Sequence, residues 1–255
     1  MNAKKLIRST FERLTGLRVM RQPPLGTDRF ADLRMVFPKQ AFRTIVDVGA
    51  NVGQSAVTFR KAWPLATVHC CEPVSSTFAK LRANVEGSMV ICHQLAMGSK
   101  EEVRIIHLAA DDRFSEINSL HEGHPFLADK ELRKEEVRVT TLENFLRERS
   151  IRSVDYLKID TEGHERSVLE GAQVPLRSEQ VGIIDIEVGM NLDNKFHVPL
   201  MQVMDQLAAS GYHLFGLYDQ MHEWPTARPV LRSCNALFVP SRMAQPGSWS
   251  PFTVD

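Results

Sequence analysis

The chain has 255 residues, of which 43% are hydrophobic and 24% charged, so it has the composition of an ordinary globular protein and the length of one large α/β domain with additions, or of two small domains. Its 31 basic and 31 acidic residues give a net charge of zero, which argues against binding to nucleic acid, because binding to phosphates requires a surplus of Lys and Arg. No stretch reaches the roughly 18–20 apolar residues of a membrane span. The four cysteines form neither a C-x-x-C pair nor a zinc-type spacing, so we expect reduced thiols and a cytoplasmic protein.

The first 21 residues predict an amphipathic helix. Large apolar residues recur at helical spacing on one face, at Leu6, Ile7, Phe11, Leu14 and Leu17. Basic residues occupy much of the remaining surface, at Lys4, Lys5, Arg8, Arg13 and Arg18. We expect this helix to pack on its own domain or on a second copy of the chain, with contact to an anionic membrane surface as the alternative. A break at Pro23-Pro24 follows, so the predicted organisation is a helix and linker over residues 1–24, a core domain over 25–242 and a tail over 243–255.

The stretch from Thr44 to Gly53 predicts the opening of a doubly wound α/β domain. A run of β-branched and apolar residues indicates a strand buried on both faces. The strand breaks at Gly49 and Gly53, and residues 54–62 can form a helix. Glycine allows positive φ angles and lets a ligand approach the backbone, so the turn is a candidate ligand-binding loop.

The second predicted strand, over residues 66–71, ends at Glu72-Pro73. An acid at the end of the second strand, roughly 20 residues beyond a Gly-rich turn, is where α/β nucleotide-binding folds bind the two hydroxyls of a ribose. Pro73 cannot continue the ladder, so we expect the strand to stop there with Glu72 facing the cleft.

The remaining elements complete the pattern. Strands are predicted over residues 89–95, 103–108, 137–139, 154–159, 181–188, 212–217 and 236–239, and helices over 75–85, 140 onward and 200–207. The helix after residue 139 is predicted to begin with a capping box made by Thr140 and Glu143. The polar stretch 109–136 is predicted to be a loop that covers a site. The predicted fold is a doubly wound, mostly parallel Rossmann-like sheet with helices on both faces and a closing antiparallel strand.

Acidic side chains follow two strands that are predicted to be neighbours. Asp160, Glu162 and His164 follow the fourth core strand, and Glu187 lies at the end of the fifth. These groups could supply a general base whose pKa burial raises toward neutrality. They could also bind a divalent cation, with Asn191 as a third oxygen donor, and oxygen ligands favour Mg²⁺, Ca²⁺ or Mn²⁺ over zinc. A structural alternative is that Glu162 caps the helix beginning near Gly163.

Three segments together resemble the FkbM-type S-adenosylmethionine-dependent methyltransferases. They are DVGANVGQSA from residue 47, CEPVSSTFAKLRAN from residue 71 and DYLKIDTEGHERSVLEGA from residue 155, and the resemblance runs from about Thr44 to Pro240. It implies a methyltransferase fold and a cofactor site whose residues are assigned from their positions in that fold. Asp47 would orient the methionine amino group directly or through water, Glu72 and Pro73 would border the ribose, and Ala96 and Met97 the adenine. The loop against the methionine moiety would comprise Gly49, Ala50, Asn51 and Gly53.

The resemblance further implies methylation of a hydroxyl on a sugar, glycan or other small molecule, with Asp160, Glu162, His164 and Glu187 as the candidate catalytic residues. Amino-methylating enzymes of nucleic acids carry N/D-P-P-Y/F, which is absent here. A nicotinamide-dependent dehydrogenase would share the strand, loop and acid but should carry G-x-G-x-x-G. A non-catalytic cofactor-binding protein would not need the acids after the fourth strand.

Overall fold

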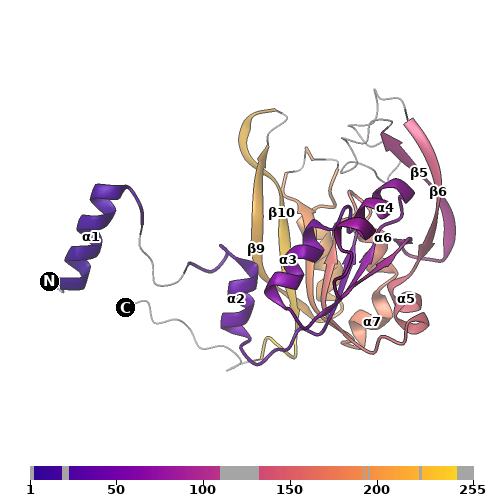
Figure 1. The fold of residues 1–255 in the computed structure, drawn as a ribbon, viewed down its shortest axis with the longest axis horizontal. Helices are drawn as coiled ribbons and strands as arrows, with labels where there is room; N and C mark the ends of the chain where they lie inside the picture. Colours follow the sequence, from indigo (N-terminus) through magenta and orange to yellow (C-terminus); the bar gives the residue numbers. More distant parts are fainter. Residues whose placement is uncertain are drawn as a thin grey trace.

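The computed structural model describes residues 3–18, 23–109, 132–191, 193–194, 196–223 and 226–245 (Figure 1). Within these residues, seven strands form the central sheet in the order β3-β2-β1-β7-β8-β10-β9. The strands are β1 (Thr44–Val48), β2 (Thr67–Cys71), β3 (Val90–His93), β7 (Val154–Ile159), β8 (Val181–Gly189), β9 (Tyr212–Glu223) and β10 (Arg228–Pro240). Strand β10 runs antiparallel to both of its neighbours, β8 and β9, and the other neighbouring strands of this sheet are parallel. This is the predicted doubly wound sheet with its closing antiparallel strand.

Helices cover both faces of the sheet because the strands are apolar on both sides. Helices α2 (Arg29–Val36), α3 (Gln54–Ala62) and α4 (Ser75–Asn84) pack on the face that carries Ile45 and Tyr156. Helices α5 (Leu142–Glu148), α6 (Glu165–Glu170), α7 (Gln173–Arg177) and α8 (Leu200–Ala208) cover the face that carries Val46 and Leu157. Strand order reverses between β1 and β7, so the carboxyl ends of these strands form the crevice in which such sheets bind ligands.

A second sheet lies beside the first. Strands β4 (Ala96–Met97), β5 (Glu102–Ala109) and β6 (Leu132–Thr140) pair in the order β4-β6-β5. The prediction of a loop over residues 109–136 is wrong at its end, because β6 begins at Leu132; residues 110–131 lie outside the described part of the chain. The predicted capping box is also displaced by one residue, since Thr141 is the N-cap of α5 and accepts from the Asn144 N–H at 3.1 Å.

The N-terminal segment forms helix α1 (Ala3–Thr15), which Figure 1 shows standing apart from the body of the molecule. Its large apolar side chains are exposed, so the expected packing on its own domain is not observed. Among the described residues, no helix has both the length and the apolar character needed to cross a membrane. The four cysteines are unpaired; Cys70, Cys71 and Cys234 are buried in strands, and Cys92 is half-buried.

Candidate active site

A cavity of about 340 Å³ opens at the carboxyl ends of β1, β2, β7 and β8. This volume is within the range of small-molecule sites, about 300–1,000 Å³. Most of the predicted site residues line it together, namely Gly49, Ala50, Asn51, Glu72, Pro73, Ala96, Met97, Asp160, Glu162, His164 and Glu187. Two predicted residues, Asp47 and Gly53, are not part of the lining.

The turn after β1 lies directly against the end of β7. Gly49 has a φ of 84°, and a Cβ atom there would come within 1.8 Å of the Asp160 carbonyl oxygen, so no other residue fits. The N–H groups of Gly49 and Ala50 both donate to the Cys71 carbonyl at 3.0 Å, which joins the turn to β2. Gly53 lets the turn pack closely against α4, because a Cβ atom at this position would lie 2.9 Å from the Leu81 side chain.

Glu72 is held rigidly at the end of β2. Its side chain is 6% exposed and accepts from the Asn51 N–H at 3.1 Å and from the Val74 N–H at 2.9 Å, one bond to each oxygen. Each carboxylate oxygen has further capacity to accept. Burial raises the pKa of Glu72 to about 7, and the two backbone donors limit that rise.

Asp47 lies inside the sheet and does not reach the cavity lining. It pairs in register with Lys158 on β7, and Lys158 pairs with Asp185 on β8, so three charged side chains form a row across neighbouring strands. Asp47 is completely buried, and neither carboxylate oxygen has a hydrogen-bond partner among the described residues. Burial raises its pKa to about 6, against the lowering effect of Lys158.

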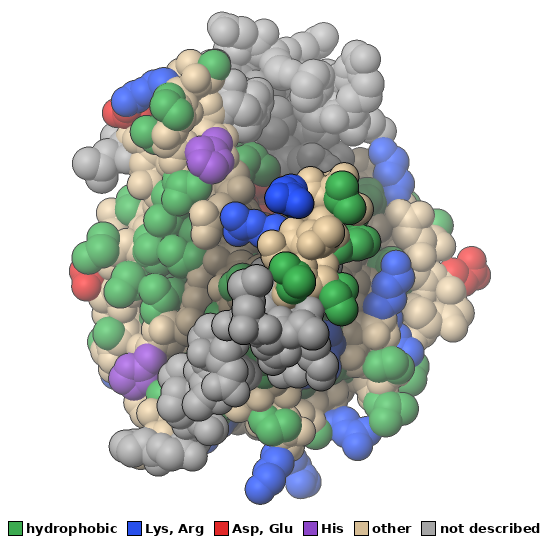
Figure 2. Space-filling model, turned by 90° about the vertical axis from the view of Figure 1, so that its left-hand side faces the viewer, with side chains coloured by type: hydrophobic (Ala, Val, Ile, Leu, Met, Phe, Trp, Pro, Cys, Tyr) green, Lys and Arg blue, Asp and Glu red, His purple; other side chains and the backbone are tan. Residues whose placement is uncertain are grey.

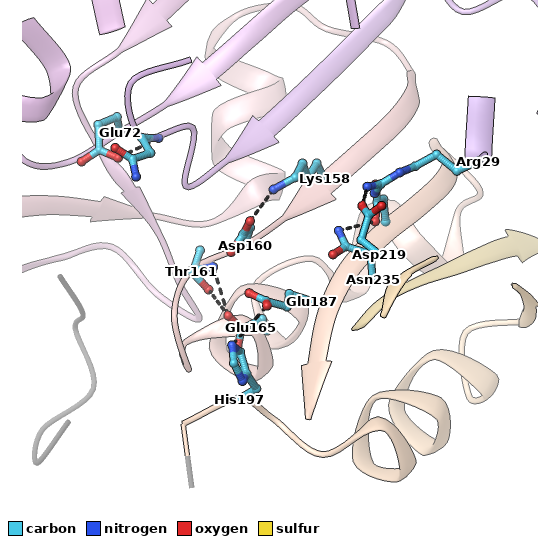
Figure 3. Close-up of polar contacts among 12 residues, drawn as sticks. Arg29, Glu72, Lys158, Asp160, Thr161, Glu165, Glu187, His197, Asp219 and Asn235 are labelled. Carbon is cyan, nitrogen blue, oxygen red and sulfur yellow. Dashed lines mark hydrogen bonds and ion pairs between the residues drawn. The ribbon is translucent and has the colours of Figure 1, made fainter. Parts of the chain in front are cut away.

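The row continues to α2, which anchors the segment preceding β1. Arg29 forms ion pairs with Asp185 and Asp219 (Figure 3). The Tyr156 hydroxyl donates to Asp185 at 2.5 Å, and the Asn235 amide donates to its other oxygen at 3.0 Å. Asp185 is therefore fully partnered by groups from α2, β7 and β10.

Two of the predicted catalytic acids form a pair. Lys158 donates to Asp160 at 2.6 Å, and Asp160 is also hydrogen-bonded to Glu187. Burial alone would raise the pKa of Asp160, but the Lys158 ammonium lowers it below its ordinary value. Burial and Asp160 raise the pKa of Glu187. The Lys158 ammonium therefore favours the ionised form of Asp160, and burial and Asp160 favour the protonated form of Glu187.

Glu162 lies in the left-handed region, with a φ of 54°, at the wall of the cavity. Burial raises its pKa to about 10, with further contributions from Asp160, Glu187 and Glu165, so it is neutral near pH 7. Glu165 fixes the loop that precedes α6, because its carboxylate accepts from the Thr161 N–H at 3.0 Å, the Thr161 hydroxyl at 3.1 Å and the Gly163 N–H at 3.1 Å. His164 is the N-cap residue of α6 and lines the cavity.

His197 is a site residue that the sequence analysis missed. Its Nε2 lies 3.2 Å from Glu187 Oε1, and its Nδ1 lies 2.8 Å from the Asn194 amide nitrogen (Figure 3). Because an amide nitrogen can only donate, Nδ1 accepts and Nε2–H donates to Glu187. The only sequence signal is an Asn three residues before a His in a loop, which is too common to single out.

The expected third oxygen donor is placed elsewhere. The Asn191 amide contacts Glu223 at 3.5 Å, and its oxygen accepts from the Asp193 N–H. Within the described residues, the group with metal-ligand geometry is instead Glu162, Glu187 and His197, whose ligand atoms all lie within 4.8 Å of one another.

Comparison with known proteins identifies the family of the chain. Residues 47–214 match the methyltransferase FkbM domain. The chain is 30% identical over 174 residues to Methyltransferase 1 of Beauveria bassiana (strain ARSEF 2860), which covers 62% of this chain and 68% of that protein. It is 28% identical over 157 residues to 31-O-demethyl-FK506 methyltransferase FkbM of Streptomyces tacrolimicus, which covers 51% of this chain and 59% of that protein. Among solved structures, the METTL16 methyltransferase domain aligns with a TM-score of 0.49 at 13% identity, over 92% of this chain and 78% of that one. Since the family match spans more than half of the sequence, the chain belongs to the FkbM family of S-adenosylmethionine-dependent methyltransferases.

Proposed function

We propose that the protein methylates a hydroxyl group of a sugar, glycan or other small molecule. The observation that carries this proposal is the Asp160–Glu187 pair, which faces the glycine turn and Glu72 across one cavity. The name of the Streptomyces relative, a 31-O-demethyl-FK506 methyltransferase, supports an oxygen acceptor.

The residues of the cavity fit the cofactor. Glu72 offers a buried, partly satisfied carboxylate to the ribose hydroxyls, and the small residues Gly49 and Ala50 let a ligand approach the turn closely. Ala96 and Met97 on β4 supply an apolar wall for the adenine. The Asp47 side chain does not line the cavity. Asp47 therefore influences the methionine amino group indirectly, either through a water molecule or through its neighbour Lys158. When bound, S-adenosylmethionine supplies an electrophilic methyl group on a sulfonium.

The Asp160–Glu187 pair is the proposed general base. An acceptor hydroxyl that attacks a methyl carbon must lose its proton, and the pair can take up that proton because Lys158 favours the ionised form of Asp160. The acceptor oxygen forms a bond to the methyl group while the carbon–sulfur bond breaks, and the leaving product is a neutral thioether. Lys158 keeps Asp160 ionised, and His197 orients Glu187 through its Nε2–H.

A cation-assisted reaction is the second candidate, and the placement of Glu162, Glu187 and His197 favours it. Two carboxylates and one imidazole would hold Mn²⁺ or Mg²⁺, completed by water and acceptor oxygens, only if Glu162 ionises and the His197 proton moves from Nε2 to Nδ1. A bound cation would lower the pKa of the acceptor hydroxyl, and the acids would then serve as ligands.

One experiment tests the function and a variation of it separates the two mechanisms. The protein is incubated with S-adenosylmethionine carrying a labelled methyl group and with a panel of polyols, oligosaccharides and hydroxylated small molecules, and products are identified by mass spectrometry and NMR. Label on oxygen supports the proposal, and label on nitrogen or carbon contradicts it. Full activity after EDTA treatment indicates the metal-free base, whereas a loss that Mg²⁺ or Mn²⁺ reverses indicates the cation.

A further inference from the structure

Helix α1 presents an apolar face that nothing in the described chain covers. Leu6, Ile7, Phe11 and Leu14 are between 45% and 78% exposed, and Leu17 just beyond the helix is 62% exposed. The helix has 13 residues and stands apart from the body (Figure 1). An isolated helix of about 12–15 residues is marginally stable in water, so α1 needs a surface to stabilise it.

The distribution of side chains around α1 suits an interface between an apolar and an aqueous phase. At 3.6 residues per turn, the large apolar side chains occupy an arc of about 140°. Lys4 and Arg13 occupy the helical positions at the two borders of this arc, and a long basic side chain such as that of Arg13 can extend its charge into water while its stem covers apolar surface. Ser9 lies on the opposite side.

The charge of the segment indicates what the surface is. Residues 3–18 contain five basic residues, Lys4, Lys5, Arg8, Arg13 and Arg18, and one acid, Glu12. That acid pairs with Arg8 at 3.3 Å, so it adds little negative character of its own. Figure 2 views the molecule from the side on which α1 lies and shows Lys and Arg side chains spread over this face, with few Asp and Glu. The side of the molecule on which α1 lies therefore presents more basic than acidic side chains.

We propose that α1 binds the surface of an anionic membrane and lies in the plane of the headgroups. Its apolar arc would enter the boundary between headgroups and acyl chains, and its basic residues would contact lipid phosphates. This anchoring is independent of the methyl-transfer reaction, because α1 contributes no residue to the cavity.

The test uses the full chain in co-sedimentation with vesicles of phosphatidylcholine alone or with phosphatidylglycerol at one third. We compare Ile7→Glu with Ser9→Glu, since both add one negative charge to α1 but only the first places it in the apolar arc. Ser9→Glu should weaken binding to the anionic vesicles by about fivefold, the effect of one charge near such a surface. Ile7→Glu should weaken it by more than about tenfold beyond that, because an apolar side chain is also withdrawn from the bilayer.

Binding to the anionic vesicles, together with the greater loss in Ile7→Glu, supports the proposal. Equal binding to both vesicle types, no binding, or equal losses in the two variants would overturn it. Sedimentation velocity without lipid tests the rival occupant. A dimer that Ile7→Glu dissociates would assign the apolar arc to a second copy of the chain and contradict membrane docking.

Discussion

Replacement of Glu72 by Gln probes the cofactor site most sharply, because the structure predicts opposite effects on binding and on stability. The Glu72 carboxylate uses one acceptor site on each oxygen for the Asn51 and Val74 N–H groups. The remaining sites are available to ribose hydroxyls. Gln keeps the shape of the side chain, but its amide nitrogen can only donate.

Binding should weaken in Glu72→Gln. Hydrogen bonds to an ionised group contribute about 1.5–3 kcal/mol each. If one such bond to the ribose is lost, the affinity for S-adenosylhomocysteine should fall by about 10- to 100-fold at pH 8.

Stability without ligand should change in the other direction. Burial raises the pKa of Glu72 from 4.5 to about 7, so this side chain favours the folded state while protonated and loses that contribution as the pH rises toward and through 7. At 1.36 kcal/mol per pKa unit, the loss is about 3 kcal/mol at pH 8. Gln does not titrate but forfeits one backbone hydrogen bond, about 1 kcal/mol. We therefore expect the variant to match the wild type near pH 5 and to exceed its free energy of unfolding by about 2 kcal/mol at pH 8.

Isothermal titration calorimetry with S-adenosylhomocysteine and urea unfolding at pH 5 and pH 8 measure the two effects. Unchanged affinity at pH 8 would remove Glu72 from the cofactor site. A parallel loss of affinity and of stability at pH 8 would show that Glu72 only holds the turn.

Three further predictions concern the charged row, the histidine and the N-terminal helix. Lys158→Met should lower the free energy of unfolding by about 3–5 kcal/mol, because it leaves Asp47 and Asp160 without their buried cation. A free energy of unfolding, measured in urea, that differs from the wild-type value by less than about 1 kcal/mol, the worth of one surface ion pair, would contradict this. His197→Phe should reduce the single-turnover rate by about 10-fold or more and leave affinity for S-adenosylhomocysteine within a few-fold, since it removes the hydrogen-bond partner of Glu187; an unchanged rate would exclude His197 from the reaction. Deletion of residues 1–21 should preserve single-turnover methyl transfer, and lost cofactor binding in a truncated protein with a native circular dichroism spectrum would show that this segment completes the site.

The elements that carry an apolar period were predictable from the sequence. Strand β1 and helix α3 have the predicted bounds because a continuous β-branched run and a glycine break determine them. Strand β6 was predicted too short because its first half lacks an apolar pattern. Its first residues, Leu132 to Glu136, are mostly charged, since they belong to an exposed pairing with β5 and need no apolar alternation.

Helix α2 was missed although a local signal exists. Asp28 caps it by accepting from the Phe30 and Ala31 N–H groups at 2.8 and 3.0 Å. The helix has only eight residues, which is too few to establish a period. Its position depends on Arg29 reaching Asp185, a contact across 156 positions that no local pattern reveals.

The site was predictable where position in the fold determines it. The end of a strand fixes Glu72, Asp160 and Glu187, because parallel strands terminate at one edge of the sheet. What local reasoning could not supply is the direction of each side chain. Asp47 precedes the turn yet lies beneath the cavity, and it is Glu165 that accepts from the N–H groups of the loop after β7. His197 enters from a loop whose path depends on tertiary packing.

Single-turnover methyl transfer by Asp160→Asn, measured beside its affinity for S-adenosylhomocysteine, tests the central claim most directly. The substitution is nearly isosteric and removes the negative charge of the Asp160–Glu187 pair. If the pair is the general base, the rate of oxygen methylation should fall by about 10²–10⁴, while cofactor affinity stays within a few-fold. A rate equal to that of the wild type, with cofactor affinity also unchanged, would contradict the assignment of catalysis to these acids.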